Sequence, residues 1–489
     1  MKKFFAAGIG LFVAVVLSGC QTEETKYEYL KFDVANLSFL GDGNAPATIK
    51  VSATGAWEAE PSASWITISE KSDDSVTVTV SDNDQENERQ SSIVFTMGDA
   101  VEEIPVNQLP MEMGGYMYRY PATLDLGLVM SPNGKYVGGE DQVLQDDQTF
   151  NWQIWIFDLD TDESRMVAEF SENMYGLQQP QCITDQGLIF ISDSNDGGTK
   201  GIDLDGNVIV PEKPDGFQNE PSVQGSSADG SIWVGYCRSA NGDAGMYYPI
   251  LWVNGKPEVL PIPDTTAHGT PQTTGVMARG CSHDGKVIYG SSWDNMENSA
   301  CFWRNNGNGY EFQWAGAPDR DLQELDYVNA SGEQVKVRQL SGPKLSAERT
   351  NISPNGKWLA VTWCREKYEG DGGYAETRFP AFINLETNKA YLYEDLGIGA
   401  GARHATNDGL GFTIDGLMTN SGKVVEIETG AVLGNMYDWI KDNYGIATSP
   451  GSIVYMTPDM QRFISLCLAD DVATGARTTH WYVAPRPQE

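Results

Sequence analysis

A four-residue turn motif that recurs seven times constrains the fold of this chain more than any other feature. Each copy begins with Ser or Thr, has Asn, Asp or Gln in third place, and in six cases ends in Gly. The copies are Ser131–Gly134, Thr184–Gly187, Ser227–Gly230, Ser282–Gly285, Ser353–Gly356, Thr406–Gly409 and Thr457–Met460. Because Asn and Asp bond to their own backbone and Gly accepts a positive φ, the motif predicts a tight turn between two strands.

Each repeat also carries strand-like residues on both sides of its turn, and several repeats show a second hairpin. Successive turns begin 43 to 71 residues apart. Examples of the second hairpin are 155–162, 251–255, 382–388 and 425–430. Two hairpins in about fifty residues make a four-stranded sheet, and that period is typical of a β-propeller blade. The sequence therefore predicts an all-β chain with a propeller over 115–487, seven-bladed, with six or eight blades as the alternatives. A single helix is expected at Met436–Tyr444.

The repeat turns also resemble those of a known class of propellers. They are similar to propellers that carry a Ser-Pro-Asp-Gly type repeat, found in cell-envelope and peptidase-associated proteins. The resemblance implies an envelope protein.

Residues 28–110 have a different pattern, in which short runs alternate apolar and polar residues and are divided by polar turns. Such period-two runs predict a small antiparallel β-sandwich with one solvent-exposed face on each sheet. Its Gly55-Ala56-Trp57, Ser64–Ile68, Arg89 and closing Val106-Asn107-Gln108 resemble a BACON domain. That immunoglobulin-like module usually stands at the N-terminus of exported bacterial proteins and was named for its association with carbohydrate-active partners. The resemblance implies a spacer, with Trp57 and Trp65 either in the core or on a sugar-stacking surface.

The first twenty residues have the three zones of a secretory signal peptide. Lys2 and Lys3 precede the apolar run Phe4–Val16, which is too short to span a bilayer. The following Leu17–Cys20 resembles the lipobox of bacterial lipoproteins. The resemblance implies acylation of Cys20, for example with palmitate, and membrane attachment through that lipid. A plain signal peptide is the alternative.

Residues 21–27 form an acidic tether after that cysteine. By resemblance to known sorting rules, the absence of an aspartate directly after Cys20 implies the outer membrane. The acidic pair Glu23-Glu24 resembles an export tag for the cell surface, although acidic tethers are also simple soluble linkers.

Charge and cysteine content narrow the classes of partner. A formal charge of −35 argues against nucleic acid as a ligand, because phosphate binding needs clustered Lys and Arg. None of the six cysteines after Cys20 lies in a Cys-x-x-Cys pair, so no zinc or redox site is expected. For these six residues, buried thiols are favoured over disulfides. We expect a monomer without a cofactor; a structural calcium ion is possible but not indicated.

The expected binding site lies on the loops that follow the second strand of each repeat. These loops vary in length, whereas the repeat turns are uniform, and variable loops on a rigid scaffold commonly carry function. Aromatic rings beside charged groups suit a sugar, which offers both C–H faces and hydroxyls. The candidates are Tyr236, Arg238, Trp293, Asp294, Trp363, Arg365, Glu366 and Tyr368.

These features predict a surface lipoprotein that binds a glycan or a protein ligand on its loop-rich face. The alternatives are a propeller hydrolase or lyase with acidic residues in its central channel, and an envelope assembly scaffold. The chain has no Gly-x-Ser-x-Gly, His-Glu-x-x-His, P-loop or dinucleotide motif, which disfavours the enzyme. His268 and His404 are candidates to line the channel, and His283, which lies in a repeat turn, is expected to be structural.

Overall fold

The structure is a computed structural model in which residues 29–484 are described, with gaps. The gaps are 35, 40, 42–43, 45, 84–88, 99, 109–117, 120–127, 145–149, 162, 173–179, 193–197, 240–244, 295–296, 329–330, 346–350, 370–372, 397–400, 415–421, 445–450 and 471–476. For some strand residues only the backbone is described. Because the described residues begin at 29, Cys20 and the tether lie outside them.

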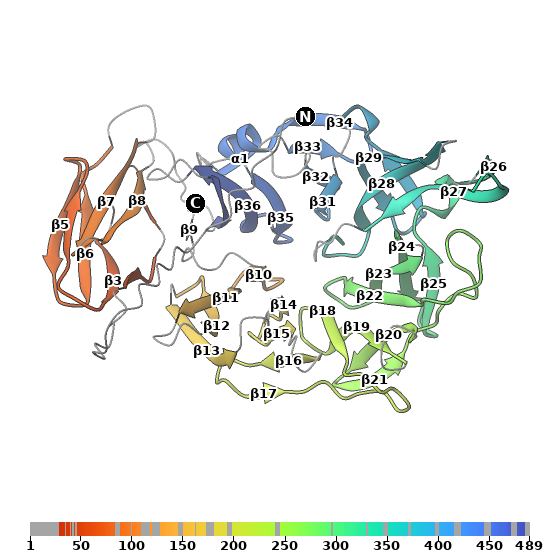
Figure 1. The fold of residues 1–489 in the computed structure, drawn as a ribbon, viewed down its shortest axis with the longest axis horizontal. Coiled ribbons are helices and arrows are strands. Elements are labelled where there is room, and N and C mark those ends of the chain that lie inside the picture. Colours follow the sequence, from red (N-terminus) through yellow and green to blue (C-terminus); the bar gives the residue numbers. More distant parts are fainter. Residues whose placement is uncertain are drawn as a thin grey trace, which may run out of the picture.

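Residues 30–108 form a sandwich of two four-stranded sheets (Figure 1, orange). One sheet has the order β1 (Leu30–Phe32), β3 (Ala47–Ala53), β6 (Ser75–Val80), β5 (Ile66–Lys71), and the other β2 (Leu37–Phe39), β8 (Ala100–Gln108), β7 (Arg89–Met97), β4 (Glu58–Pro61). Side chains from both sheets, including Ile49, Val78, Phe95 and Val106, are fully buried between them. The alternating pattern of the sequence therefore does mark one buried face on each sheet.

The residues that carry the BACON resemblance are structural. Trp57 is 4% exposed, and its indole nitrogen donates to the carbonyl oxygen of Asp73 at 2.9 Å. Arg89 donates from Nε and from a terminal nitrogen to Oε1 of the buried Gln108, at 2.9 and 2.7 Å. Its guanidinium also lies 4.6 Å from the ring centre of the half-buried Trp65. Of the two alternatives for Trp57, the structure supports the core.

The remaining strands form sheets arranged in a ring around a central axis (Figure 1). Repeats one to three each give a four-stranded antiparallel sheet. These are β10 (Val129–Met130), β11 (Tyr136–Leu144), β12 (Phe150–Asp158), β13 (Glu163–Glu172); β14 (Pro180–Ile183), β15 (Ile189–Ser192), β16 (Thr199–Ile202), β17 (Val208–Ile209); and β18 (Ser222–Ser226), β19 (Ile232–Arg238), β20 (Tyr247–Val253), β21 (Lys256–Val259).

Repeats six and seven also give four-stranded sheets, and the last one is completed by a strand from the start of the ring. They are β31 (Gly401–Ala405), β32 (Leu410–Ile414), β33 (Lys423–Glu426), β34 (Ala431–Asn435), and β35 (Gly451–Met456), β36 (Phe463–Asp470), β37 (Arg477–Ala484), β9 (Tyr118–Arg119). In each of these sheets the first strand lies nearest the axis, which is the arrangement of a β-propeller. The predicted fold class is confirmed.

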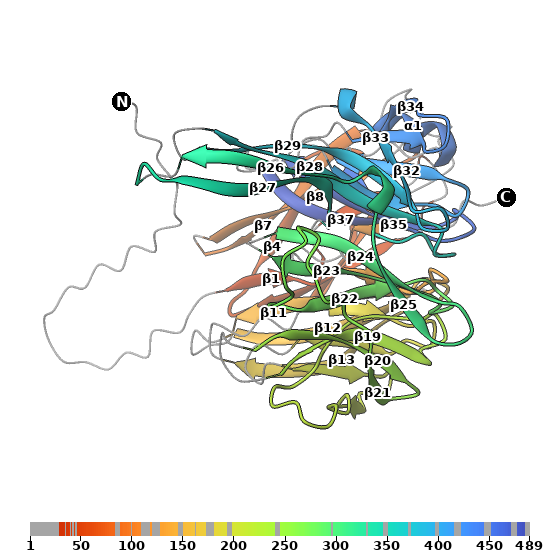
Figure 2. The same ribbon diagram turned by 90° about the vertical axis from the view of Figure 1, so that its right-hand side faces the viewer.

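Repeats four and five share one nine-stranded sheet, so the count of seven separate blades stays a prediction. The sheet contains β22 (Val276–Cys281), β23 (Val287–Asp294), β24 (Glu297–Asn305), β25 (Tyr310–Trp314), β26 (Asp321–Val328), β27 (Gln334–Lys344), β28 (Trp358–Glu369), β29 (Gly373–Asn384) and β30 (Lys389–Leu392). The hairpin of β26 and β27 is an insertion, and β27 pairs with β28. This insertion explains why the longest interval between turns, 71 residues, lies here. The hairpin extends past the other sheets in Figure 2.

The predicted helix is confirmed with the same bounds, as α1 (Met436–Tyr444). Met436 and Ile440 are fully buried and pack with Phe412 and Phe463 of the last two repeats. Two 3₁₀ turns, Ala317–Asp319 and Glu394–Leu396, are the other helical elements among the described residues. In that part of the chain no helix has the length and apolarity needed to cross a membrane.

The described cysteines also behave as small apolar side chains. Cys237, Cys281 and Cys301 are free thiols within the propeller core. Burial raises the pKa of the Cys237 thiol to about 11, so this group is neutral at physiological pH. This agrees with the sequence interpretation for these three residues.

Five of the seven repeat turns are held by the same internal side-chain hydrogen bonds. In repeat five, Ser353 Oγ donates to Asn355 Oδ1 at 2.8 Å, and the same oxygen accepts from the amide of Lys357 at 3.0 Å. The amide of Trp358 returns to Ser353 Oγ at 2.9 Å. The Gly at the fourth position has a positive φ in all six copies that have it, and Met460 adopts φ 57° at the same place.

Neighbouring turns are also joined to one another. The amide of Asp185 donates to the carbonyl of Ala228, that of Ala228 to His283, and that of His283 to Pro354, at 2.9 to 3.0 Å. In two further places the bond goes to a side chain, from the Asn133 amide to Asp185 Oδ1 and from the Asn355 amide to Asn407 Oδ1, both 2.8 Å. These bonds place the turns side by side on one face of the ring, here called the turn face.

Arg462 closes this face between the last and the first repeat. Its guanidinium is 7% exposed and donates to the carbonyl of Gly134 at 2.6 Å and to Asp160 Oδ1 at 2.8 Å. At the rim, β37 pairs with β9 through Tyr482↔Arg119 and Val483↔Tyr118. The ring is thus closed by a strand pairing and by one buried arginine.

We expect Gly356→Ala to destabilise the propeller more than Gly430→Ala. Both glycines have a similar positive φ, 74° and 77°, which costs alanine about 1 kcal/mol. Only at Gly356 would the new methyl group meet other side chains, at 2.9 Å from Val287 and 3.0 Å from Ser282. Urea unfolding should show a difference of about 1 kcal/mol or more between the two variants. Equal losses would mean that the turn is not tightly packed against its neighbour.

Candidate ligand-binding face

The centre of the turn face is filled by side chains from different repeats. The buried hydroxyl of Tyr455 donates to the carbonyl of Pro132 at 2.9 Å and lies 3.1 Å from His283 Nε2. The ring of His404 is 5.4 Å from that of Tyr455. These groups belong to repeats seven, one, four and six, so they meet near the axis. His404 therefore does lie in the centre of the ring, but as part of a packed cluster.

The protonation of this cluster follows from its hydrogen bonds. Because the single hydroxyl proton of Tyr455 goes to Pro132, the Nε2 atom of His283 must carry the donor hydrogen. Burial, with a further effect of His404, lowers the pKa of His283 to about 4. Burial also raises the pKa of Tyr455 well above its usual value. Both side chains are neutral at physiological pH, and His283 has the structural role expected for a turn residue.

On the loop-rich face the structure brings two predicted residues into one cluster. Tyr236 and Arg238 lie on β19, at the end remote from the repeat turn, and Tyr247 pairs with Arg238 from β20. The rings of Tyr236 and Tyr247 are 5.5 Å apart and nearly perpendicular, at 81°. The guanidinium of Arg238 lies 4.8 Å from the Tyr247 ring, and that of Arg279 on β22 lies 5.6 Å from the Tyr236 ring. These four half-buried residues are called the Tyr–Arg cluster.

The alternation of β19 explains this placement. Trp233 and Cys237 point to the side of repeat two, where they pack in one buried cluster with Phe190. Val234 points to the opposite side and is buried against repeat four. Tyr236 and Arg238 share the side of Val234 but lie nearer the loop-rich face, where they keep contact with solvent.

The arginines of the cluster have neutral partners among the described residues. Arg279 donates to Gln224 Oε1 at 3.2 Å and contacts Met277 Sδ at 3.6 Å. Arg238 Nε is 3.4 Å from the carbonyl oxygen of Gly245. In a chain with 68 acidic residues, two adjacent arginines without a carboxylate partner in this part of the structure leave positive charge for a ligand.

Trp363 does not belong to this face, and the expectation for this residue is wrong. It is 1% exposed, and its indole nitrogen donates to Ser341 Oγ at 3.0 Å. Its ring lies in the buried core between repeats four and five, in one cluster with Tyr289 and Phe302. A buried ring cannot stack on a ligand.

Of the other predicted residues, Arg365 has a different partner, and four lie outside the described side chains. Arg365 is exposed and makes a two-pronged ion pair with Glu394, at 2.7 and 2.6 Å. For Trp293 and Asp294 on β23, and Glu366 and Tyr368 on β28, the side chains lie outside the described residues. The sequence analysis missed Tyr247 and Arg279, because only the strand pairing shows that they face Tyr236.

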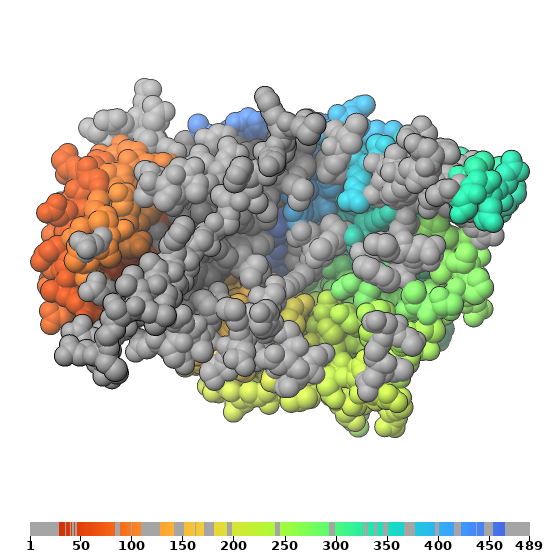
Figure 3. Space-filling view, in the orientation of Figure 1, coloured from red at the N-terminus to blue at the C-terminus, as the bar shows by residue number. Residues whose placement is uncertain are grey.

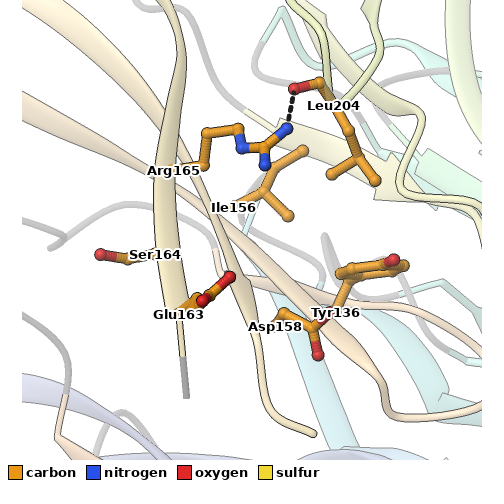
Figure 4. Close-up of a pocket in the computed structure, with 7 residues that line it drawn as sticks. All are labelled: Tyr136, Ile156, Asp158, Glu163, Ser164, Arg165 and Leu204. Carbon is orange, nitrogen blue, oxygen red and sulfur yellow. Dashed lines mark hydrogen bonds between the residues drawn. The ribbon is translucent and has the colours of Figure 1, made fainter. Parts of the chain in front are cut away.

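A groove of about 390 Å³ lies between repeats one and two, away from the Tyr–Arg cluster of repeats three and four (Figure 4). It is lined by Tyr136, Ile156, Asp158, Glu163, Ser164, Arg165 and Leu204. Arg165 donates to the carbonyl of Leu204 at 3.0 Å, and Asp158 is 3.4 Å from Lys135. Arg165 therefore connects the two repeats, whereas Asp158 pairs within repeat one. Among the described residues, no group of three or more His, Cys, Asp or Glu side chains could hold a metal ion.

We expect His283 to make the propeller less stable in mild acid. The folded pKa of about 4 lies below the ordinary value of 6.5, so protonation favours the unfolded chain. The contribution of neutral His283 is complete above pH 6.5, falls as the pH is lowered from 6.5 to 4, and is absent below pH 4. Between these values the unfolding free energy of the wild type should fall by about 1 kcal/mol per pH unit more than that of His283→Gln. Parallel pH profiles would contradict the burial of this imidazole.

Comparisons with known proteins found one family model and several solved structures that are similar to parts of this chain. Residues 55–109 match the family model BACON, described as "Putative binding domain, N-terminal". No curated protein matches the chain. Among solved structures, TolB from Acinetobacter baumannii is 14% identical with a TM-score of 0.31, over 62% of this chain and 58% of that one. The β-propeller domain of the Trilobed protease from Pyrococcus furiosus is 12% identical with a TM-score of 0.33, over 83% and 94%.

A third similar structure, prolyl oligopeptidase B from Galerina marginata, is 8% identical with a TM-score of 0.39, over 81% of this chain and 53% of that one. This chain thus spans less than two thirds of the length of the TolB and oligopeptidase structures. It combines a module similar to the BACON binding domain with a β-propeller.

Proposed function

We propose that this protein is a lipid-anchored protein of the outer cell surface that binds a glycan on the loop-rich face of its propeller. The observation that carries the proposal is the Tyr–Arg cluster. The BACON-like sandwich serves as a spacer between the membrane and the propeller.

The chemistry of the cluster fits a sugar. Tyr236 and Tyr247 are half-buried, so each ring is held in place and still meets solvent. Their perpendicular rings offer two differently oriented apolar faces to the C–H groups of a sugar. Arg238 and Arg279 lie against these rings and add several N–H donors for ring and hydroxyl oxygens.

The turn face is a poorer candidate. Its turns are joined by backbone hydrogen bonds, and its centre is filled by Tyr455 and the two histidines. A ligand there would have to displace bonds that hold neighbouring repeats together. The bonds between the repeat turns lie on the other face, so a ligand on the loop-rich face does not have to displace them.

A protein ligand is the alternative occupant of the same face, because Tyr and Arg also dominate protein interfaces. The rival enzyme needs acidic side chains where the substrate would lie. In the Tyr–Arg cluster the described side chains include Tyr236, Tyr247 and Arg279, with Gln224 beside them. None of these carries a carboxylate, which favours binding over hydrolysis at the cluster.

The position of the sandwich supports its role as a spacer. Strand β2 of the sandwich lies next to β9, the strand that completes the last propeller sheet. In Figure 3 the sandwich forms one end of the molecule, and the hairpin of β26 and β27 lies at the opposite end. A tether at the N-terminus of the sandwich would therefore hold the propeller by one side of its ring.

Cys20→Ala is expected to abolish attachment to the outer membrane. Without the thiol no lipid can be added, and the acyl chains are the proposed anchor. Fractionation of cells that express the wild type and the variant, with labelled palmitate and with protease treatment of intact cells, measures both attachment and exposure. Retention of the variant in the membrane fraction would contradict the lipid anchor.

Tyr236→Ala and Tyr247→Ala should each weaken glycan binding about tenfold, which corresponds to about 1.4 kcal/mol. Tyr391→Ala is the matched control, because Tyr391 lies on the outer strand β30, far from the cluster in the sheet order. A glycan array identifies ligands, and calorimetry measures affinity for the best of them. If the array is empty while an envelope protein is captured, the face binds protein instead.

A further inference from the structure

Five inner strands of the propeller contain a β-bulge at the same place, three residues before the repeat turn. In each strand the pairing register with the next strand skips one residue. The skipped residues are Gln181 on β14, Gln224 on β18, Arg279 on β22, Arg403 on β31 and Val454 on β35. They are called the bulge layer. A bulge re-aims its extra side chain, and its recurrence in different repeats indicates a designed feature.

The bulge layer continues directly into the Tyr–Arg cluster. Arg279 belongs to both, since its guanidinium meets the side chain of Gln224 at 3.2 Å and the ring of Tyr236 at 5.6 Å. Gln224 in turn donates to Ser222 Oγ at 2.9 Å. Polar groups of the third and fourth repeats therefore form a continuous row from the inner strands to the loop-rich face.

On the side of the turn face, the layer borders the neutral cluster at the axis. Arg403 precedes His404, and Val454 precedes Tyr455. Burial lowers the pKa of Arg403 to about 10, which leaves its guanidinium protonated at physiological pH. The five residues of this layer are thus two arginines, two glutamines and one valine, and none of them is acidic.

We propose that the bulge layer and the Tyr–Arg cluster together recognise the carboxylate of an acidic glycan. This inference rests on the proposed function and specifies its ligand. A guanidinium binds a carboxylate through two parallel hydrogen bonds, which are about twice as strong as bonds between neutral groups. The two glutamines add amide donors at the same level. Neutral sugars need none of this charge, whereas an acidic sugar needs a local cationic site to overcome repulsion by a protein of net charge −35.

Matched pairs of polysaccharides test the role of the carboxylate. Three acidic polysaccharides and their methyl esters are titrated in a calorimeter into the full chain without its signal peptide. The acids are polygalacturonate, alginate and hyaluronate. At least one acid should bind more than tenfold tighter than its ester. Arg279→Gln should weaken binding of that acid about tenfold and binding of the ester by a clearly smaller factor, because the ester loses only bonds between a guanidinium and neutral oxygens. Arg279→Lys, which keeps the charge without the planar fork, should fall between them.

Arg165→Gln is the control, because Arg165 is an exposed arginine between repeats one and two, away from the cluster. Unchanged thermal unfolding of the Arg279 variants shows that a loss of affinity is a loss of contact. The inference is overturned if acid and ester bind equally well, or if Arg279→Gln weakens the binding of both by the same factor. It is also overturned if none of the three acids and three esters binds. The glycan array with Tyr236→Ala decides the proposed function independently, because it includes neutral glycans.

Discussion

The hydrogen bonds between neighbouring repeat turns are the interaction on which the rest of the propeller depends. A four-stranded sheet cannot bury both of its faces alone, so each repeat needs its neighbours in a fixed position. The bonds from Asp185 through Ala228 and His283 to Pro354 fix that position with backbone groups, which do not vary with the side chain. The recurrence of the turn motif in the sequence is the trace of this requirement.

This division of labour separates stability from recognition. The turn face is held by bonds between repeats and by the neutral cluster around Tyr455, so its side chains have little freedom to change. The opposite face lies outside the bonds that join the repeat turns, and it can accommodate loops of different lengths. The contact of Arg279 with Tyr236 shows how the inner strands still reach that face.

The sequence predicted what is determined locally. The repeat turns and the helix Met436–Tyr444 follow from short-range hydrogen bonding and from one apolar face, and both were found where they were expected. Trp363 was placed wrongly because its burial depends on packing against Tyr289 and Phe302 of the neighbouring repeat, which only the folded ring brings into contact with it. Arg279 was missed because a bulge appears only once the strand register is known. Among the predicted residues whose side chains are described, Tyr236 and Arg238 came together, since they are alternate residues of one strand.

The joining of β9 to β37 makes assembly of the ring wait for the end of the chain. Among the described strands β9 pairs with β37 alone, so the last sheet stays incomplete until residues 482–483 arrive. During that time β9 and β36 each expose an unpaired edge, which is a site for aggregation or proteolysis. A chain cut short before β37 would keep these open edges permanently.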